Sequence, residues 1–337
     1  MSDIYLSVDA GNSDTKVEYR TPLDSVARYF LMSSAVEEVT KSKLKDYRER
    51  KGWLGSPVPE KQAWLEWNEQ VFLVGALAYE FDPCDRRVEP KYENAVYKVL
   101  AAIGVIVQKH QLATTKKLKV RLGVLLPCNE YSDRHRFQKS LELMSSSYQF
   151  RGQTIKVKLE EVVCRPEGGG LAIARMRLNG EEWFSRQRLG VWMLGDRNFT
   201  GLYFESGELK VSDSPLIGFS FMLDRIIERT SGLTRASLTE AIFQGLQEAQ
   251  KTYPEDSSFP CRPPWEELEA IKALATARDP SLRSLEVKDI ACAIESVASE
   301  WDEKIQKWLK RIFPKRLTEI SVCGGRFHFC SDNRATL

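Results

Sequence analysis

A strand-like run near the amino terminus ends at an acidic residue and is followed by a glycine turn and a lysine. The spacing is Asp9-x-Gly11-x-x-x-x-Lys16, with Asn12 and Ser13 inside the turn. Successive backbone N–H groups in such a turn can form a concave site for phosphate oxygens. Gly11 permits close approach, Lys16 supplies positive charge, and Asp9 could hold a water molecule on a divalent cation. We interpret this segment as a candidate phosphate-binding hairpin.

The same residues also suit an ordinary hairpin turn with an exposed lysine. Short glycine motifs occur freely, and the segment is not a Walker loop, because no GxxxxGK[ST] run leads into a helix here. Asp14 is expected to accept hydrogen bonds from the backbone of the turn and not to bind a metal ion. Whether the hairpin binds phosphate therefore depends on the segments that accompany it.

Three later segments carry residues of a similar type. They are Arg165-Pro166-Glu167-Gly168-Gly169, Leu194-Gly195-Asp196-Arg197-Asn198 and Cys323-Gly324-Gly325. The second and third follow apolar, strand-like runs and could be simple turns. Arg197 could contact phosphate, or it could be an exposed arginine of its turn.

The elements expected around these motifs alternate between strands and helices. Strand hairpins are expected near the start and again past the middle, at residues 4–32 and 189–212, and further strands at 118–126, 153–163 and 317–322. Helices are expected at 94–108, 131–144, 171–178 and 287–312, the first of them apolar on most faces and therefore buried. Residues 33–53 are polar and rich in lysine, whereas Trp64 and Trp67 are three apart and would share a helical face. This pattern predicts an α/β chain of two related halves with a hinge at residues 165–185.

The composition is that of an ordinary globular protein with room for about two domains. The 337 residues include 49 basic and 47 acidic side chains, so a net charge of +2 gives no whole-chain attraction to DNA or to anionic membranes. No run is long and apolar enough to cross a bilayer, and the first residues lack the pattern of a secretory signal. Seven scattered cysteines, none spaced as CxxC, indicate reduced thiols and a cytoplasmic location.

The order of the motifs resembles the actin, sugar-kinase and DnaK-chaperone superfamily. Within it, the chain is most similar to the ParM-type actins that segregate bacterial plasmids and to their archaeal relatives. The matching positions are Asp9, Gly11, Lys16, residues 123–127, residues 165–169, Gly195, residues 218–220, Gly324 and Gly325. The resemblance implies an α/β, actin-like (ribonuclease H-like) fold with duplicated mixed-sheet halves and a nucleotide cleft between two domains, at residues 1–175 and 176–337.

The resemblance also implies roles for individual residues. A nucleotide, ATP or GTP, would be bound by Gly11, Asn12, Ser13, Lys16, Gly195, Arg197, Asn198, Gly324 and Gly325. Asp9 would act in catalysis and on Mg²⁺ through a water molecule, and Glu167 would position the water that attacks the terminal phosphate. Glu167 has a simpler alternative role, as a carboxylate favoured by the dipole of the helix that follows Pro166.

The second phosphate motif departs from the family pattern. It usually opens with aspartate, but Met193 stands at that position, and Asp196 lies three residues further on. The usual threonine or serine is replaced by Asn198. Coordination of metal-bound water from the second domain, and with it the rate of hydrolysis, is therefore open.

Three functions are compatible with these residues. The first is an ATPase that forms nucleotide-dependent filaments for plasmid or DNA segregation or for a cytoskeletal role, with itself and a DNA-bound adaptor as partners. The second is a small-molecule kinase of the same superfold, although no motif supplies its catalytic aspartate. The third is a non-hydrolysing scaffold, which Met193 favours.

Overall fold

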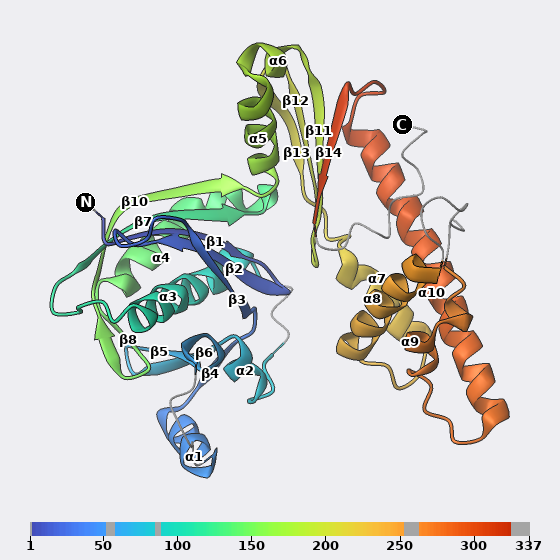
Figure 1. Ribbon diagram of the computed structural model, residues 1–337, viewed down its shortest axis with the longest axis horizontal. Coiled ribbons are helices and arrows are strands. Elements are labelled where there is room, and N and C mark those ends of the chain that lie inside the picture. The colour runs from blue at the N-terminus through green and yellow to red at the C-terminus, as the bar shows by residue number, and fades with distance from the viewer. Residues whose placement is uncertain (1, 52–57, 85–88, 253–262, 325–337) are drawn as a thin grey trace. The chain divides into compact units, whose positions relative to one another are not determined.

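The computed structural model describes residues 2–51, 58–84, 89–252 and 263–324 (Figure 1). The chain divides into two compact units, Met1–Gly169 and Gly170–Leu337. Each unit has its own hydrophobic core. In the described part of the chain, no helix combines the length and the apolar character that crossing a membrane requires.

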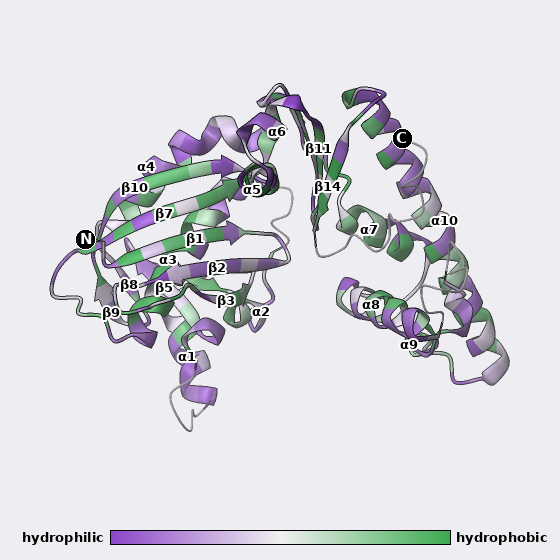
Figure 2. Ribbon diagram, turned by 45° about the horizontal axis from the view of Figure 1, so that its top comes forward, coloured by the Kyte–Doolittle hydropathy of each residue, from purple (hydrophilic) through white to green (hydrophobic). Residues whose placement is uncertain are grey.

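The first unit contains a mixed sheet built around the amino-terminal hairpin. In order across the sheet, its strands are β10 (Val157–Pro166), β7 (Leu118–Leu126), β1 (Ile4–Ala10), β2 (Asp14–Arg20) and β3 (Arg28–Ser33). Strand β1 is parallel to β7 and antiparallel to β2, and β10 is parallel to β7. Side chains alternate along β1, so Ile4, Leu6 and Val8 are buried while Tyr5 and Ser7 lie on the other face. Figure 2 shows the same alternation of hydrophobic and hydrophilic residues along β1 and β7.

A second, antiparallel sheet completes the first unit. Its strands are β4 (Val36–Val39), β6 (Gln70–Val74), β5 (Ala63–Trp67), β8 (Tyr148–Phe150) and β9 (Gln153–Ile155). The other elements of this unit are α1 (Lys41–Lys51), η1 (Pro59–Lys61), α2 (Ala76–Tyr79), η3 (Cys128–Asp133) and α4 (Arg134–Ser145). A small core separate from the main one includes Leu44, Tyr47, Trp64, Leu73 and Leu77.

Helix α3 (Lys91–Lys109) lies between the two sheets of the first unit, as Figure 1 shows. It packs against β1 of the mixed sheet and against β5 and β6 of the antiparallel sheet. Residues from Val99 to Val107 are all buried, which confirms the expectation of a buried helix. Because apolar side chains surround this helix on both sides, a lysine on it has to find its partners inside the protein.

The second unit repeats the topology of the first around its own mixed sheet. Its strands, in order, are β13 (Glu208–Asp213), β12 (Phe199–Glu205), β11 (Arg188–Leu194) and β14 (Glu319–Cys323). β11 is antiparallel to β12 and parallel to β14, as β1 is to β2 and β7. The predicted α/β architecture with duplicated mixed sheets is confirmed.

Helices form the rest of the second unit. They are α5 (Gly169–Asn179), α6 (Glu181–Arg186), α7 (Phe219–Arg229), α8 (Arg235–Thr252), η4 (Trp265–Glu267), α9 (Glu269–Lys272) and α10 (Pro280–Ile312). Arg175 on α5 binds Glu319 on β14 through two hydrogen bonds, of 2.6 and 3.0 Å. The fully buried Trp301 of α10 donates a hydrogen bond to the carbonyl oxygen of Ile217 at 2.9 Å. The first contact joins α5 to β14, and the second holds α10 against the segment that precedes α7.

Two local expectations were wrong, and two elements had not been anticipated. Trp64 and Trp67 lie in strand β5 and not on a helix. The polar segment 33–53 contains β4 and α1, which the sequence pattern did not indicate. Helix α10 begins at Pro280, seven residues before the expected start at residue 287.

Candidate functional site

The carboxyl ends of three parallel strands meet at one edge of the mixed sheet in the first unit. Strand β1 brings Asp9 to this edge, and Glu167 follows directly after β10. The N–H of Glu167 donates to the carbonyl oxygen of Leu126, the last residue of β7, at 2.9 Å. Gly168 then takes a φ of +82°, a conformation that glycine adopts without strain, and turns the chain toward α5. In α/β sheets, ligands bind at the carboxyl ends of strands, which makes this edge the candidate site.

A buried lysine connects the two carboxylates at this edge. Lys91, the first residue of α3, donates a hydrogen bond to Asp9 Oδ1 at 3.1 Å and a second one to Glu167 Oε1. The Lys91 side chain is only 5% exposed. Burial alone would lower the pKa of Lys91, but the charges of Glu167 and Asp9 outweigh it and raise that pKa above its ordinary value. The lysine is therefore a fixed cation inside the site.

The start of α3 is held where Lys91 needs it. Pro90 precedes the helix, and its φ of −55° suits a helix entry. The N–H of Tyr92, one of the helix's first amides, donates to the carboxylate of Glu130 at 3.2 Å. This carboxylate also complements the positive end of the helix dipole. A distant residue thus supplies the cap that the local sequence lacks.

Asp9 has a second lysine partner on the hairpin itself. Asp9 and Lys16 are directly paired across β1 and β2, and Lys16 Nζ lies 3.3 Å from Asp9 Oδ2. Burial would raise the pKa of Asp9, but Lys91 and Lys16 together lower it. Lys16 is 64% exposed, so the outer side of the hairpin keeps an accessible cation. The motif Asp9-x-Gly11-x-x-x-x-Lys16 therefore places its two charged residues side by side.

The turn between β1 and β2, residues 11–13, is here called the Gly11 turn. A Cβ atom on Gly11 would lie 2.6 Å from the carbonyl oxygen of Asp14, closer than real Cβ contacts allow. Two side chains bind the turn from elsewhere in the fold. Lys98 of α3 donates to the carbonyl oxygen of Gly11 at 2.9 Å, and the hydroxyl of Ser34 donates to the carbonyl oxygen of Asn12. The turn is therefore pinned by its carbonyl groups.

The corresponding turn of the second unit, residues 195–198, is here called the Gly195 turn. The N–H of Gly195 donates to the carbonyl oxygen of Asn198 at 2.9 Å. The N–H groups of Gly218, Phe219 and Ser220 donate to the carbonyl oxygens of Arg197, Gly195 and Asp196, at 3.0, 3.1 and 2.8 Å. The carbonyl oxygens of the Gly195 turn thus accept hydrogen bonds from the amides at the start of α7. These amides therefore already have partners within the protein.

Side chains around the Gly195 turn differ in how they face the solvent. Asn198 is buried, and its amide donates to the carbonyl oxygen of Ser214 at 2.7 Å, so it supports the turn from inside. Arg197 is partly buried, which differs from the exposed arginine considered above. Met193 pairs with Thr200 on one side and Cys323 on the other, in the middle of the sheet.

The late glycine pair is described only in part. Gly324 follows β14 with a φ of +119°, and a Cβ atom on it would lie 2.1 Å from the carbonyl oxygen of Leu194. The end of β14 is therefore packed against the start of the Gly195 turn. Gly325 lies outside the described residues. In the second unit the structure brings together Gly195, Arg197, Asn198 and Gly324.

Sequence reasoning missed Lys91, Lys98 and Ser34. A signal existed for Lys98 but not for Lys91, which precedes the expected start of the helix at residue 94. A cation inside the apolar run 94–108 has to be paired or expelled, and Lys98 could have been singled out on that ground. Nothing in the sequence connects Ser34 to the Gly11 turn.

The donor groups fit a phosphate chain better than a metal ion. The pinned Gly11 turn and the exposed Lys16 are groups that bind phosphate oxygens. By contrast, each carboxylate oxygen of Asp9 already has a lysine within 3.3 Å. Across the described ranges, no cluster of three or more histidine, cysteine, aspartate or glutamate side chains could hold a metal ion. Residues of this site do not form a metal-binding set.

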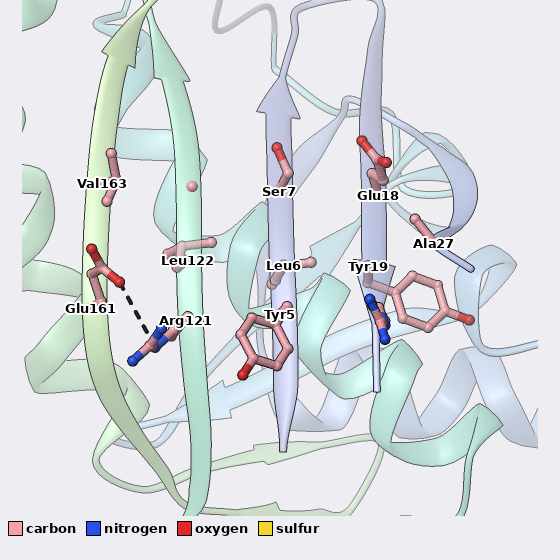
Figure 3. Close-up of a pocket in the computed structure, with 12 residues that line it drawn as sticks. Tyr5, Leu6, Ser7, Glu18, Tyr19, Ala27, Arg121, Leu122, Glu161 and Val163 are labelled. Carbon is pink, nitrogen blue, oxygen red and sulfur yellow. Dashed lines mark ion pairs between the residues drawn. The ribbon is translucent and has the colours of Figure 1, made fainter. Parts of the chain in front are cut away.

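A separate cavity of about 450 Å³ lies on the face of the same sheet (Figure 3). Tyr5, Arg20, Arg121 and Glu161 are among its lining residues, and the last two form an ion pair at 3.8 Å. The predicted phosphate-binding residues do not line it. The cavity is shallow and belongs to the middle of the strands, away from their carboxyl ends.

Comparisons with known proteins agree with this architecture. Residues 7–170 match the family described as the N-terminal domain of actin-like proteins. No curated protein matches the chain. Among solved structures, ParM from Bacillus thuringiensis with ATP is 14% identical with a TM-score of 0.53, covering 98% of this chain and 89% of that one. An archaeal actin homologue is 15% identical (TM-score 0.51; 96% and 88% covered), and the Alp12 filament structure is 13% identical (TM-score 0.50; 96% and 88% covered). Residues 7–170 therefore match the N-terminal domain of the actin-like proteins, and the actin-like fold extends over nearly the whole chain.

Proposed function

We propose that this actin-like protein binds a nucleoside triphosphate and assembles into nucleotide-dependent filaments. The observation that carries the proposal is the group of residues at one sheet edge of the first unit. There Lys98 holds the Gly11 turn, Asp9 pairs with Lys16 beside it, and Lys91 joins Asp9 to Glu167. The ATP-bound ParM structure, which shares the fold, supports a nucleotide as the ligand.

The proposed binding mode uses one turn from each half of the chain. The N–H groups of the Gly11 turn and the ammonium of Lys16 would bind phosphate oxygens. The Gly195 turn and the glycine pair after β14 would bind the rest of the nucleotide. In this proposal, residues 1–175 and 176–337 act as the two domains of the actin-like fold.

Hydrolysis would be slow in the arrangement that the structure shows. A bound triphosphate supplies a phosphoanhydride bond, and Glu167 would accept a hydrogen bond from the attacking water. Lys91 already binds Oε1 of Glu167, and its positive charge makes the carboxylate a weaker hydrogen-bond acceptor for the water. We therefore propose a weak ATPase whose rate depends on the Lys91–Glu167 contact.

Self-association is the proposed output of nucleotide binding. The Alp12 chain, which shares this fold, was solved as a filament. Contacts between two different surfaces of identical subunits give open filaments when the rotation does not close a ring. We propose a role for these filaments in plasmid or DNA segregation, through a DNA-bound adaptor protein, or in a cytoskeleton.

A non-hydrolysing scaffold is the second candidate. Both carboxylates expected in catalysis already bind Lys91 in this structure, and Met193 stands where the family usually has aspartate. A protein of this kind would bind nucleotide and assemble without releasing phosphate.

Sedimentation with and without nucleotide tests the proposal. Purified protein is pelleted with ATP, with a slowly hydrolysed ATP analogue and without nucleotide, each with Mg²⁺, and phosphate release is followed in parallel. Gly11→Ala should weaken nucleotide binding about tenfold or more, a loss of about 1.4 kcal/mol, because the added Cβ forces the turn to move. Gly123→Ala is the matched control, since a Cβ there meets nothing closer than 3.8 Å.

The outcomes separate the candidates. Pelleting that rises with nucleotide, together with phosphate release, supports the filament-forming ATPase. The same pelleting without phosphate release identifies the scaffold. Absence of nucleotide binding by the unmodified protein would overturn both.

A further inference from the structure

We propose that Lys98 and Ser34 are positioning residues that aim the N–H groups of the Gly11 turn at phosphate, with Lys98 also placing a titratable positive charge beneath the turn. The inference rests on the proposed nucleotide binding and specifies how the first phosphate site is built. Neither residue is expected to touch the nucleotide, since both are buried.

The Lys98 contact fixes the orientation of one peptide plane. Lys98 Nζ donates to the carbonyl oxygen of Gly11 at 2.9 Å, and the Lys98 residue is only 3% exposed. In a planar trans peptide, the carbonyl of one residue and the N–H of the next point in opposite directions. Because the carbonyl of Gly11 points to a donor inside the protein, the N–H of Asn12 points away from the interior.

Ser34 does the same for the next peptide plane. Its hydroxyl, on the segment just after β3, donates to the carbonyl oxygen of Asn12. By the same geometry, the N–H of Ser13 points away from Ser34, and Ser13 is exposed. Within the residues that the structure describes, neither the N–H of Asn12 nor that of Ser13 has a hydrogen-bond acceptor. Two successive outward amides are the kind of donor pair that binds an anion.

Burying the ammonium group of Lys98 costs free energy, and one hydrogen bond to a carbonyl oxygen does not explain why a lysine stands at this position. Burial and, to a lesser extent, the positive charge of Lys91 lower the pKa of Lys98 to about 7, although Asp9 acts in the opposite direction. These two residues, on α3 and β1, are the charged groups that act on Lys98. A glutamine or methionine would fit a buried helix at lower cost. A lysine with a perturbed pKa beside a candidate anion site is instead typical of functional sites.

Binding of two fluorescent ligands, mant-ATP and mant-adenosine, tests the inference on the full chain. Lys98→Met should weaken mant-ATP at about pH 6 by roughly tenfold, the factor that about 1.4 kcal/mol represents, and leave mant-adenosine unchanged. Ser34→Ala should likewise weaken mant-ATP and leave mant-adenosine unchanged. This variant retains Lys98, so it tests the inference even if Lys98→Met fails to fold. Wild-type affinity for mant-ATP should fall between about pH 6 and pH 8.5, while Lys98→Arg, which stays protonated, should show a smaller fall. Protonation of the nucleotide itself affects all the proteins alike, so it cancels when each variant is compared with wild type at the same pH.

Each result decides something different. Equal weakening of both ligands would assign Lys98 a structural role and overturn the inference, as would a Lys98→Met variant that binds mant-ATP like wild type. A Lys98→Arg variant with the wild-type pH dependence would overturn the part concerning charge. Failure of the wild-type protein to bind mant-ATP at either pH would overturn the proposed function and this inference together.

Discussion

Lys91 donates a hydrogen bond to Glu167 from the first turn of α3, although the two residues are 76 positions apart in the chain. The same ammonium group also binds Asp9 at 3.1 Å. One buried cation thus lies between two carboxylates that would otherwise repel each other at the edge of the sheet.

Removing this cation should destabilise the first unit. Lys91→Met leaves Asp9 and Glu167 without their shared partner, and breaking a buried ion pair typically costs about 3–5 kcal/mol. Lys16→Met removes the other, exposed partner of Asp9 and should cost about 1 kcal/mol or less. Urea unfolding at neutral pH measures both. Losses of equal size in the two variants would show that Lys91 is not the main counter-ion of the site.

The sequence allowed part of this site to be predicted. Asp9 and Lys16 could be placed together because hairpin register pairs them directly. Lys91 could not, because α3 was expected to begin at residue 94. The usual start signal, a serine, threonine or aspartate cap, is absent, and Glu130 supplies its equivalent from 38 residues away. Contacts between residues this far apart in the sequence depend on the tertiary fold and leave no local sequence pattern.

Glu167 is expected to affect phosphate release and not nucleotide binding. Glu167→Ala should slow release by about 100-fold, the lower end of what a positioned acid–base group contributes, while filaments persist. Glu161→Ala is the control, since Glu161 lies on β10, the strand that Glu167 follows, is exposed and pairs only loosely with Arg121 at 3.8 Å. Release is measured with a coupled phosphate assay and assembly by light scattering. Unchanged release in Glu167→Ala would remove this residue from the mechanism.

Errors in the fold prediction have physical causes that can be named. Helix α1 buries only Leu44 and Tyr47, so its sequence shows almost no apolar face, and it is held by a small core from β5, β6 and α2. The three-residue spacing of Trp64 and Trp67 fits a helix, but the strand β5 pairs on both sides and overrides it. By contrast, the alternating patterns of β1 and β7 were sufficient, because each is a half-buried strand with a strict period of two.

Lys98 should make stability depend on pH in a window that can be calculated. Burial lowers its pKa from 10.5 to about 7 in the folded protein. Between these values the unfolded chain binds the proton and the folded chain does not, so the free energy of unfolding rises with pH. From about pH 7 to pH 9, wild type should gain about 2 kcal/mol relative to Lys98→Met, which lacks this group. Parallel pH profiles of the two proteins in chemical denaturation would contradict the assignment.

Gly324 should be far less tolerant of a side chain than a glycine of similar conformation elsewhere in the same unit. Gly324 and Gly232 both have positive φ, of 119° and 73°. An alanine at either position carries the backbone penalty of roughly 1–2 kcal/mol. At Gly232 a Cβ meets nothing within 4 Å, whereas at Gly324 it would lie 2.1 Å from the carbonyl oxygen of Leu194. That oxygen belongs to backbone at the end of β11, so relief requires β14 or the Gly195 turn to move.

We therefore expect Gly232→Ala to lower the free energy of unfolding by about 1 kcal/mol and Gly324→Ala by about 3 kcal/mol or more. Thermal unfolding followed by circular dichroism compares the two variants with wild type. Gly324→Ala should also weaken nucleotide binding, because Gly324 packs the end of β14 against the Gly195 turn and the added Cβ displaces that turn. Gly232→Ala should leave nucleotide binding unchanged. Equal losses of unfolding free energy in the two variants would mean that the end of β14 moves without cost. Gly324 would then have no structural link to the Gly195 turn.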